Sequence, residues 1–100
     1  MIQHIVLLKL KTGTTEEQKA ALLHGLVALS QGKIPGIETV SGGDNNSPEG
    51  KAQDFDWGFA MTFTDRAARD AYLPHPEHKE LGRNLLRAIV DDVLVFDYEF

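Results

Sequence analysis

The residues best suited to chemistry lie in one stretch, 71–82, which reads Ala-Tyr-Leu-Pro-His-Pro-Glu-His-Lys-Glu-Leu-Gly. There Tyr72, His75 and His78 surround two prolines that interrupt a helical pattern. Pro76 suits the first position of a new helix, because its missing N–H costs nothing there. His78 would then lie in the first helical turn, where the positive end of the dipole disfavours imidazolium. We therefore expect a neutral ring that can accept a proton.

A neutral histidine beside a tyrosine suits proton abstraction next to a carbonyl group. His78 would be the general base, and Tyr72 would donate a hydrogen bond to the enolate oxygen. His4, at the start of the first strand, could orient His78 or bind substrate. The alternative is structural: the tyrosine and the histidine satisfy each other or the backbone. The spacing alone favours this alternative, because short motifs have a high false-positive rate.

A metal site is a weaker interpretation of the same stretch. His75 and His78 are three residues apart, but a histidine pair without a third convergent ligand is a weak signal. Magnesium prefers oxygen ligands, and acidic side chains near helix ends are usually just solvated. The acidic residues that could be recruited are Glu77, Glu80, Asp91, Asp92 and Asp97. We predict no metal site, and the proposed chemistry needs no cofactor.

Composition narrows the class of protein. One hundred residues with 42% hydrophobic content make one domain, residues 1–100, with its own core. A net charge of −5 argues against nucleic-acid binding, which favours a basic surface. The absence of cysteine excludes disulfides, thiolate metal sites and cysteine nucleophiles. There is no apolar run long enough to span a membrane and no signal-peptide pattern, so we expect a cytoplasmic protein.

Four segments have the alternation or the β-branched and aromatic content of strands. They are Met1–Lys11, about Ile37–Asp44, Phe55–Thr64 and Val93–Glu99. In the third, the large residues Trp57, Phe59, Met61 and Phe63 alternate with small or polar ones, which predicts a bulky face toward the helices. Gly42 and Gly43 weaken the second strand and suggest an edge, a bend or a bulge.

Three helical segments separate these strands. The first runs from about Thr15 to Gln31, and Thr14 and Glu17 have the spacing of a capping box. Gly25 inside it either marks a close approach to the sheet or is simply tolerated. The second, Arg66–Tyr72, follows Asp65 as its cap, and the third runs over about Pro76–Ile89.

The resulting order, β-α-β-β-α-β, predicts an α+β, ferredoxin-like fold. One four-stranded antiparallel sheet would carry helices on one face. The other face would present apolar side chains: Ile5, Leu7, Val40 or its neighbour, Ala60, Leu94 and Phe96. Contiguous apolar patches of this kind usually mark an interface, so we predict a homodimer that packs sheet against sheet.

Four segments together resemble the stress-responsive A/B barrel domain family, often called Dabb. They are His4-Ile-Val-Leu-Leu-Lys-Leu-Lys11, Ile34-Pro-Gly-Ile37, Tyr72-Leu-Pro-His-Pro-Glu-His78 and Phe96-Asp-Tyr98. The resemblance spans nearly the whole chain in the right order, and the Tyr…His-Pro-x-His element is its most specific part. It implies a ferredoxin-like fold that dimerises through its sheets into an α+β barrel.

The resemblance also implies a function. A plant polyketide cyclase of this family closes a linear polyketide thioester by aldol condensation, and its catalytic histidine and tyrosine fall on His78 and Tyr72. The implied substrate is thus a small apolar carbonyl compound in a pocket between sheet and helices. The implied pocket positions are His4, Val6, Leu8, Leu23, Leu26, Phe59, Leu73, His75, Leu81 and Val95.

This chain departs from the cyclase at several pocket positions. Leucines at 22, 23, 26 and 81 replace aromatic residues, which would enlarge the pocket unless neighbours fill it. Since family membership indicates fold better than function, a non-catalytic dimer that binds a small ligand or acts structurally is the alternative. A haem-degrading or cofactor-free monooxygenase role, found in other dimeric α+β barrels, is a further one, and nothing in the sequence specifically indicates it.

Overall fold

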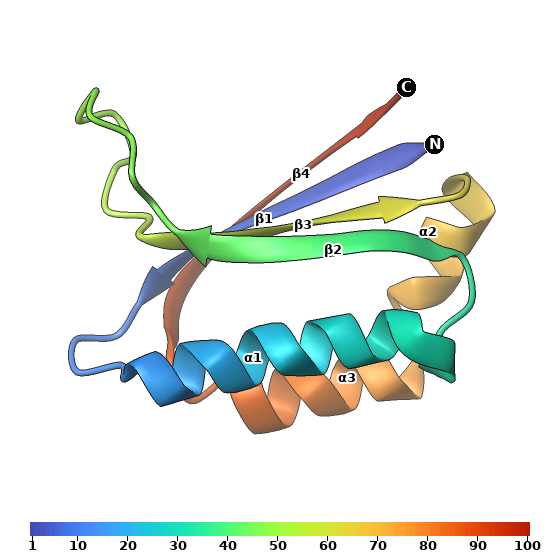
Figure 1. Cartoon of the computed structure of the whole chain (residues 1–100), viewed down its shortest axis with the longest axis horizontal. Helices are drawn as coiled ribbons and strands as arrows, with labels where there is room; N and C mark the ends of the chain where they lie inside the picture. Colours follow the sequence, from blue (N-terminus) through green and yellow to red (C-terminus); the bar gives the residue numbers. More distant parts are fainter.

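Four antiparallel strands form one sheet in the order β2-β3-β1-β4, and the helices cover one of its faces (Figure 1). The computed structural model describes all residues, 1–100. Its strands are β1 (Ile2–Leu10), β2 (Ile37–Asp44), β3 (Trp57–Phe63) and β4 (Val90–Glu99). Its helices are α1 (Glu16–Ala28), α2 (Arg66–Tyr72) and α3 (Pro76–Leu81), with π-type turns η1 (Leu29–Lys33) and η2 (Gly82–Leu86). The expected ferredoxin-like arrangement is confirmed.

The strands present one set of side chains to the helices, because side chains alternate between the two faces of a sheet. The β1 residues on this side are buried: Ile2, His4, Val6 and Leu8. In β3, the buried residues Trp57, Phe59, Met61 and Phe63 join the same core. The bulky face of β3 was therefore assigned correctly from the sequence.

A reciprocal pair of hydrogen bonds starts α1, one residue later than the sequence suggested. The Gln18 N–H donates to Thr15 Oγ1 (3.1 Å), and the Thr15 N–H donates to Gln18 Oε1 (2.9 Å). The predicted box of Thr14 and Glu17 is thus wrong by one position. Thr14 instead donates its hydroxyl to the Lys11 carbonyl (2.7 Å), which closes the preceding turn. Two adjacent threonines made the spacing ambiguous.

Both long helices end earlier than predicted. The regular part of α1 stops at Ala28, and η1 contains Gln31 (φ −99°, ψ 57°) and Gly32 (φ 92°) outside helical geometry. The third predicted helix is α3 followed by η2, after which the chain enters β4 at Val90. The wide turns let the backbone leave each helix and re-enter the sheet.

Gly25 lets α1 approach the third helical segment. A methyl group on Gly25 would lie 2.9 Å from Leu85 Cδ1 and 3.0 Å from Leu81 Cδ1. The close approach is therefore between α1 and the α3–η2 segment, and not to the sheet, which was one of the two alternatives for Gly25. Figure 1 shows α1 and α3 side by side on one side of the sheet.

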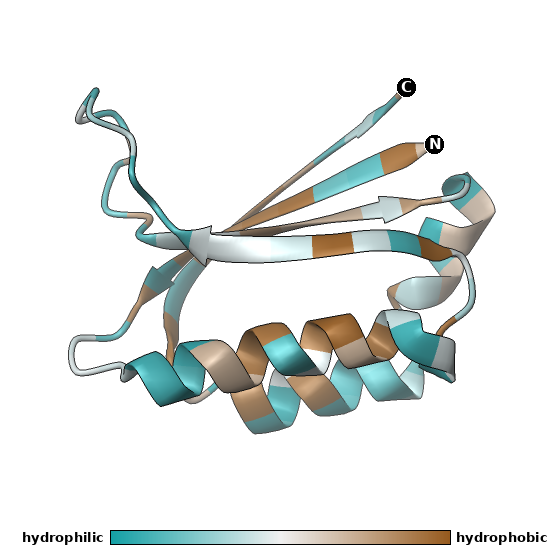
Figure 2. Cartoon of the chain, in the orientation of Figure 1, coloured by the Kyte–Doolittle hydropathy of each residue, from teal (hydrophilic) through white to brown (hydrophobic).

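The helix-free face of the sheet is apolar and open. Phe96 is 62% exposed and Leu94 is 50% exposed, and Leu7, Ile5 and Ala60 lie on the same face. Val40 faces the helices instead, because it pairs with the buried Met61, and its neighbour Ser41 takes the outer position. The loop between β2 and β3, residues 45–56, is hydrophilic over most of its length (Figure 2). No helix is long and apolar enough to cross a membrane.

Candidate active site

Tyr72 and His78 meet at the break between two helices. Tyr72 is the last residue of α2, and His78 is the third residue of α3. Pro74 lies between the helices, where its ring favours a break in the helical backbone. As a result the Tyr72 and His78 rings stack with their centroids 4.1 Å apart and their planes at 31°. The structure therefore brings these two predicted site residues into contact.

The backbone fixes which nitrogen of His78 can act as a base. His78 Nδ1 lies 3.0 Å from the carbonyl oxygen of Leu73. A carbonyl oxygen can only accept a hydrogen bond, so Nδ1 must carry the proton. Nε2 of the neutral ring then holds the free lone pair. This arrangement orients the ring and leaves a single atom able to take a proton.

Tyr72 is suited to donate a hydrogen bond but not to act as a base. Its side chain is almost completely buried, at 1% exposure. Burial raises the pKa of the Tyr72 hydroxyl well above its usual range, because the phenolate would lose its hydration. The hydroxyl therefore stays protonated at any physiological pH. A neutral phenol in such a site can stabilise a developing oxyanion.

A partly buried network of hydrogen bonds holds His4 next to Tyr72. His4 Nδ1 donates to Asp97 Oδ1 (2.7 Å), and Arg69 donates to Asp97 Oδ2 (2.8 Å). Arg69 also donates a hydrogen bond to Asp70, and its bonds to Asp70 and Asp97 raise the pKa of the guanidinium. The His4 ring is 4% exposed and lies edge-on to Tyr72, with centroids 5.9 Å apart. The network thus connects β1, β4 and α2 beside the Tyr72–His78 pair.

Sequence reasoning assigned no role to Arg69 and considered Asp97 only as a weak metal ligand. The pairing of β1 with β4 shows the role of Asp97, because Asp97 is the direct cross-strand partner of His4. Strand alternation alone places Asp97 on the same side of β4 as Val95, but it does not show which residue of β1 lies opposite. No cluster of three or more histidine or acidic residues could hold a metal ion.

His75 has a structural task in this geometry. Its Nδ1 accepts a hydrogen bond from the Glu77 N–H (3.1 Å), which caps the start of α3. Because Nδ1 is the acceptor here, the ring is held by the helix that also carries His78. A direct contact of His75 with a ligand stays a prediction.

The apolar residues predicted to line the pocket fall into two groups. Most are core residues with little or no exposed surface: Val6, Leu8, Leu26, Phe59 and Leu81. Leu23 is half-buried at the edge of this core. Leu73 and Val95 are instead exposed, at 46% and 55%. The predicted set therefore does not surround one open chamber.

An uncovered strip on β4 leads to the polar cluster. Val93 and Val95 face the helix side of the sheet, next to Leu8 and Val6, yet they remain exposed. The next residue on this side is Asp97, which binds His4. None of the five principal cavities of the surface is lined by Tyr72 or His78. The pair therefore does not open onto any of these cavities.

A comparison of the whole sequence with known families agrees with this fold. The chain matches the family described as Stress responsive A/B Barrel Domain, or Dabb, over residues 2–100. This protein belongs to the Dabb family. The match confirms the resemblance seen in its sequence motifs. Olivetolic acid cyclase from Cannabis sativa is 28% identical over 97 residues, which cover 97% of this chain and 94% of the cyclase.

Solved structures of similar proteins share the fold over nearly their full length. A protein of Arabidopsis thaliana superimposes with a TM-score of 0.91 at 29% identity, covering 100% of this Dabb chain and 95% of the other. A dimeric ferredoxin-like protein of unknown function from Jannaschia gives a TM-score of 0.84 at 30% identity, covering 99% and 98%. These structures confirm the fold class, and the second is described as a dimer.

Proposed function

We propose that this Dabb protein catalyses cofactor-independent enolate chemistry, of the cyclase or lyase type, on a small apolar carbonyl compound. His78 is the base and Tyr72 is the oxyanion donor. The observation that carries the proposal is the orientation of His78, whose Nδ1–H is held by the Leu73 carbonyl while Nε2 is free. Similarity to olivetolic acid cyclase over 97% of the chain supports the same reaction class.

The proposed reaction needs proton transfer and carbon–carbon bond formation, and neither step requires a cofactor. Nε2 of His78 takes a proton from the carbon next to the carbonyl, and the electron pair moves onto the carbonyl oxygen. The Tyr72 hydroxyl donates a hydrogen bond to this oxyanion. The enolate carbon then attacks a second carbonyl of the same molecule, and the protonated His78 returns its proton to the new alkoxide.

The substrate would lie along the uncovered strip of β4. Val93 and Val95 offer an apolar surface, and Leu73, whose carbonyl oxygen lies 3.0 Å from His78 Nδ1, is also exposed. His4 occupies the inner end, where its ring contacts Tyr72 and its Nδ1 is bound to Asp97. We therefore assign His4 the task of positioning Tyr72 or contacting the substrate carbonyl.

We also propose that two copies pack through their helix-free faces. Leu94 and Phe96 leave large apolar surfaces in water on this face, and burying apolar surface is worth about 25 cal/mol per Å². The dimeric Jannaschia relative supports a homodimer.

A non-catalytic role is favoured by a different observation. The core beneath the candidate site is filled, and Tyr72 packs against Phe63 with centroids 5.1 Å apart. In this alternative the tyrosine and the histidine only stabilise the break between α2 and α3, and the dimer binds a small ligand or acts structurally.

The substitution His78→Asn separates the two functions. The asparagine amide N–H₂ can still donate to the Leu73 carbonyl, but it cannot accept a proton. Exchange of α-protons in D₂O would be followed by NMR for aryl ketones and linear poly-β-ketone thioesters. We expect wild type to accelerate exchange, and the variant to lose about 10²–10⁴-fold. His24→Asn, an exposed histidine of α1, is the matched control and keeps full activity.

The stability of His78→Ala completes this test. If wild type gives no exchange above buffer and His78→Ala loses about 2 kcal/mol or more in chemical denaturation, His78 is structural. All samples need the same protein concentration, because dimer stability depends on it.

A further inference from the structure

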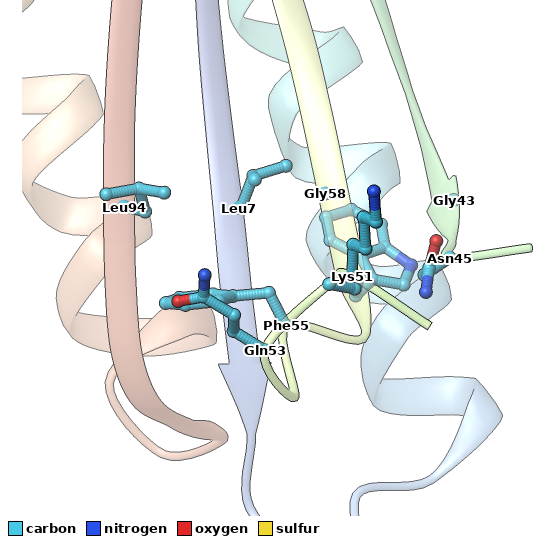
Figure 3. Close-up of a pocket in the computed structure, with 10 residues that line it drawn as sticks. Leu7, Gly43, Asn45, Lys51, Gln53, Phe55, Gly58 and Leu94 are labelled. Atoms are coloured by element: carbon cyan, nitrogen blue, oxygen red, sulfur yellow. The ribbon is translucent and has the colours of Figure 1, made fainter. Parts of the chain in front are cut away.

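Two glycines make a depression in the helix-free face of the sheet. Gly43 of β2 and Gly58 of β3 are direct cross-strand partners, so two adjacent positions on this face have no side chain. Leu7 is the next residue in the same row, and its side chain lies over Gly58, where a Cβ would be 2.9 Å from Leu7 Cδ2, whereas the position of Gly43 is open. Leu94 follows Leu7 in the row. The depression is part of a cavity of about 350 Å³, and Figure 3 shows the residues around it. This volume is at the lower end of the range for small-ligand sites.

The β2–β3 loop forms the other wall of the cavity. Phe55 contributes an aromatic ring, and Lys51 and Gln53 also line the space. Gln53 (φ 53°) and Asp54 (φ 68°) are both in the left-handed region, which is unusual for residues other than glycine. Non-glycine residues are held in such conformations only where the surroundings determine them, and these sites are often functional. The loop is thus constrained where it meets the cavity.

The polar groups of the cavity favour an acceptor-rich, anionic ligand. Lys51 is the only charged residue in the lining, and no carboxylate lines it, although the chain has a net charge of −5. Asn45 Oδ1 accepts a hydrogen bond from the Ser47 N–H (3.0 Å), so its amide N–H₂ is the group left for another partner. The remaining walls are mainly apolar, from Leu7, Leu94 and Phe55.

We propose that this cavity binds a small apolar carboxylate. The carboxylate group would accept hydrogen bonds from Lys51 and Asn45, and the apolar body would lie over Gly43, against Leu7, Leu94 and Phe55. The site is on the opposite face of the sheet from His78 and shares no residue with the candidate active site. It therefore does not depend on the proposed catalysis. Two of its walls, Leu7 and Leu94, belong to the face through which we propose that the dimer forms, so in this dimer the ligand would lie at the interface between the two copies.

Gly43→Val is the decisive variant. A Cβ at Gly43 meets no atom within 4 Å, and its φ is not in the left-handed region. Valine should therefore fit the strand, where β-branched residues are favoured, while its side chain fills the cavity. We expect unchanged or higher stability together with loss of carboxylate binding. If Gly43 had only a structural role, Gly43→Val would not abolish carboxylate binding while leaving stability unchanged.

Trp57 provides the readout, because it is the only tryptophan and it lines the cavity. The single indole N–H resonance of ¹⁵N-labelled protein would be followed during titration with cyclohexanecarboxylate, cyclohexanecarboxamide and cyclohexylmethylamine. We expect the carboxylate to bind most tightly and the amine least. Lys51→Gln should weaken carboxylate binding about fivefold, as expected for an exposed ion pair. Lys79→Gln, with the same charge change on α3, should have no effect.

Two results would overturn the proposal. One is an equal response to all three probes, or none at all. The other is a shift of Gly43→Val toward monomer in sedimentation velocity with no carboxylate binding by wild type, because the cavity would then hold side chains of a second copy. Neither result affects the α-proton exchange expected of His78, so the two proposals fail independently.

Discussion

At the scale of single residues, the candidate site depends on hydrogen bonds that fix the protonation of each ring. The Leu73 carbonyl selects the His78 tautomer, and the Asp97 carboxylate selects that of His4. Tyr72 is instead buried among apolar and aromatic side chains, and this burial keeps its hydroxyl neutral. The proposed base and the proposed oxyanion donor therefore lie on two stacked rings, as the proposed enolate chemistry needs.

The buried tyrosine predicts a loss of stability in alkaline solution. The folded-state pKa of Tyr72 is raised above its unfolded value of about 10. Above about pH 10 the unfolded chain releases this proton while the folded chain retains it, so stability falls as pH rises, by at most about 1.4 kcal/mol per pH unit. Tyr72→Phe should remove this component. Urea denaturation of both proteins between pH 8 and 11 checks it, and parallel curves would contradict the assignment.

Asp97 is predicted to be the most sensitive residue of the polar network. Asp97→Ala would leave the His4 Nδ1–H and the Arg69 guanidinium without their shared acceptor in a largely buried place. Losing a hydrogen bond to a charged group costs about 1.5–3 kcal/mol. Asp91→Ala, exposed on the same strand, should change the free energy of unfolding by less than about 0.5 kcal/mol. Equal losses in the two variants would show that the network contributes nothing specific.

At the scale of elements, the start of α1 offers a matched pair of variants. Thr15→Ala removes the side chain that accepts the Gln18 N–H, and loss of such a cap costs about 1 kcal/mol. Thr14→Ala removes only an exposed hydrogen bond to the Lys11 carbonyl and should cost clearly less. Thermal denaturation of both variants ranks the two threonines. The reverse order would mean that the helix begins at Thr14 in solution.

The elements were predictable where one local signal determines them. Asp65 caps α2 through the Ala68 N–H (2.8 Å), and β2 runs over Ile37–Asp44 as expected. The helix ends were less predictable, because η1 and η2 depend on how the chain returns to the sheet. Gly25 could be recognised as a helix position, but its partner Leu85 is distant in sequence, so only the folded structure identifies it.

The candidate site was predictable only in part, for the same reason. The proline break between Tyr72 and His78 is a local signal, and the rings do meet there. The Asp97–His4 pair depends on strand register, and the paired glycines Gly43 and Gly58 depend on a second register. An apolar residue such as Val95 has the same pattern in the sequence whether a helix covers it or solvent does. Exposure of the β4 strip therefore appears only in the whole fold.

At the scale of the whole molecule, the open sheet face predicts a dimer that one charge should disrupt. Phe96 is the most exposed apolar side chain within the strands on this face; it lies on the edge strand β4, between Leu94 and Tyr98 and opposite Ile5 of β1. Phe96→Lys would place a charge in a surface that must lose its water on association, and burying an unpaired charge is strongly unfavourable. We expect wild type to sediment as a dimer, and the variant to shift toward monomer at micromolar concentration.

Ala20→Lys is the matched control for this variant, because Ala20 is exposed on α1 and the substitution adds the same charge away from the sheet. It should remain dimeric. Since the wild-type dimer gains stability from association, its midpoint of thermal unfolding should rise with protein concentration, whereas that of Phe96→Lys should not. If Ala20→Lys dissociates and Phe96→Lys does not, the copies meet through their helices, and the β4 strip and the His78 site would then be covered by the partner.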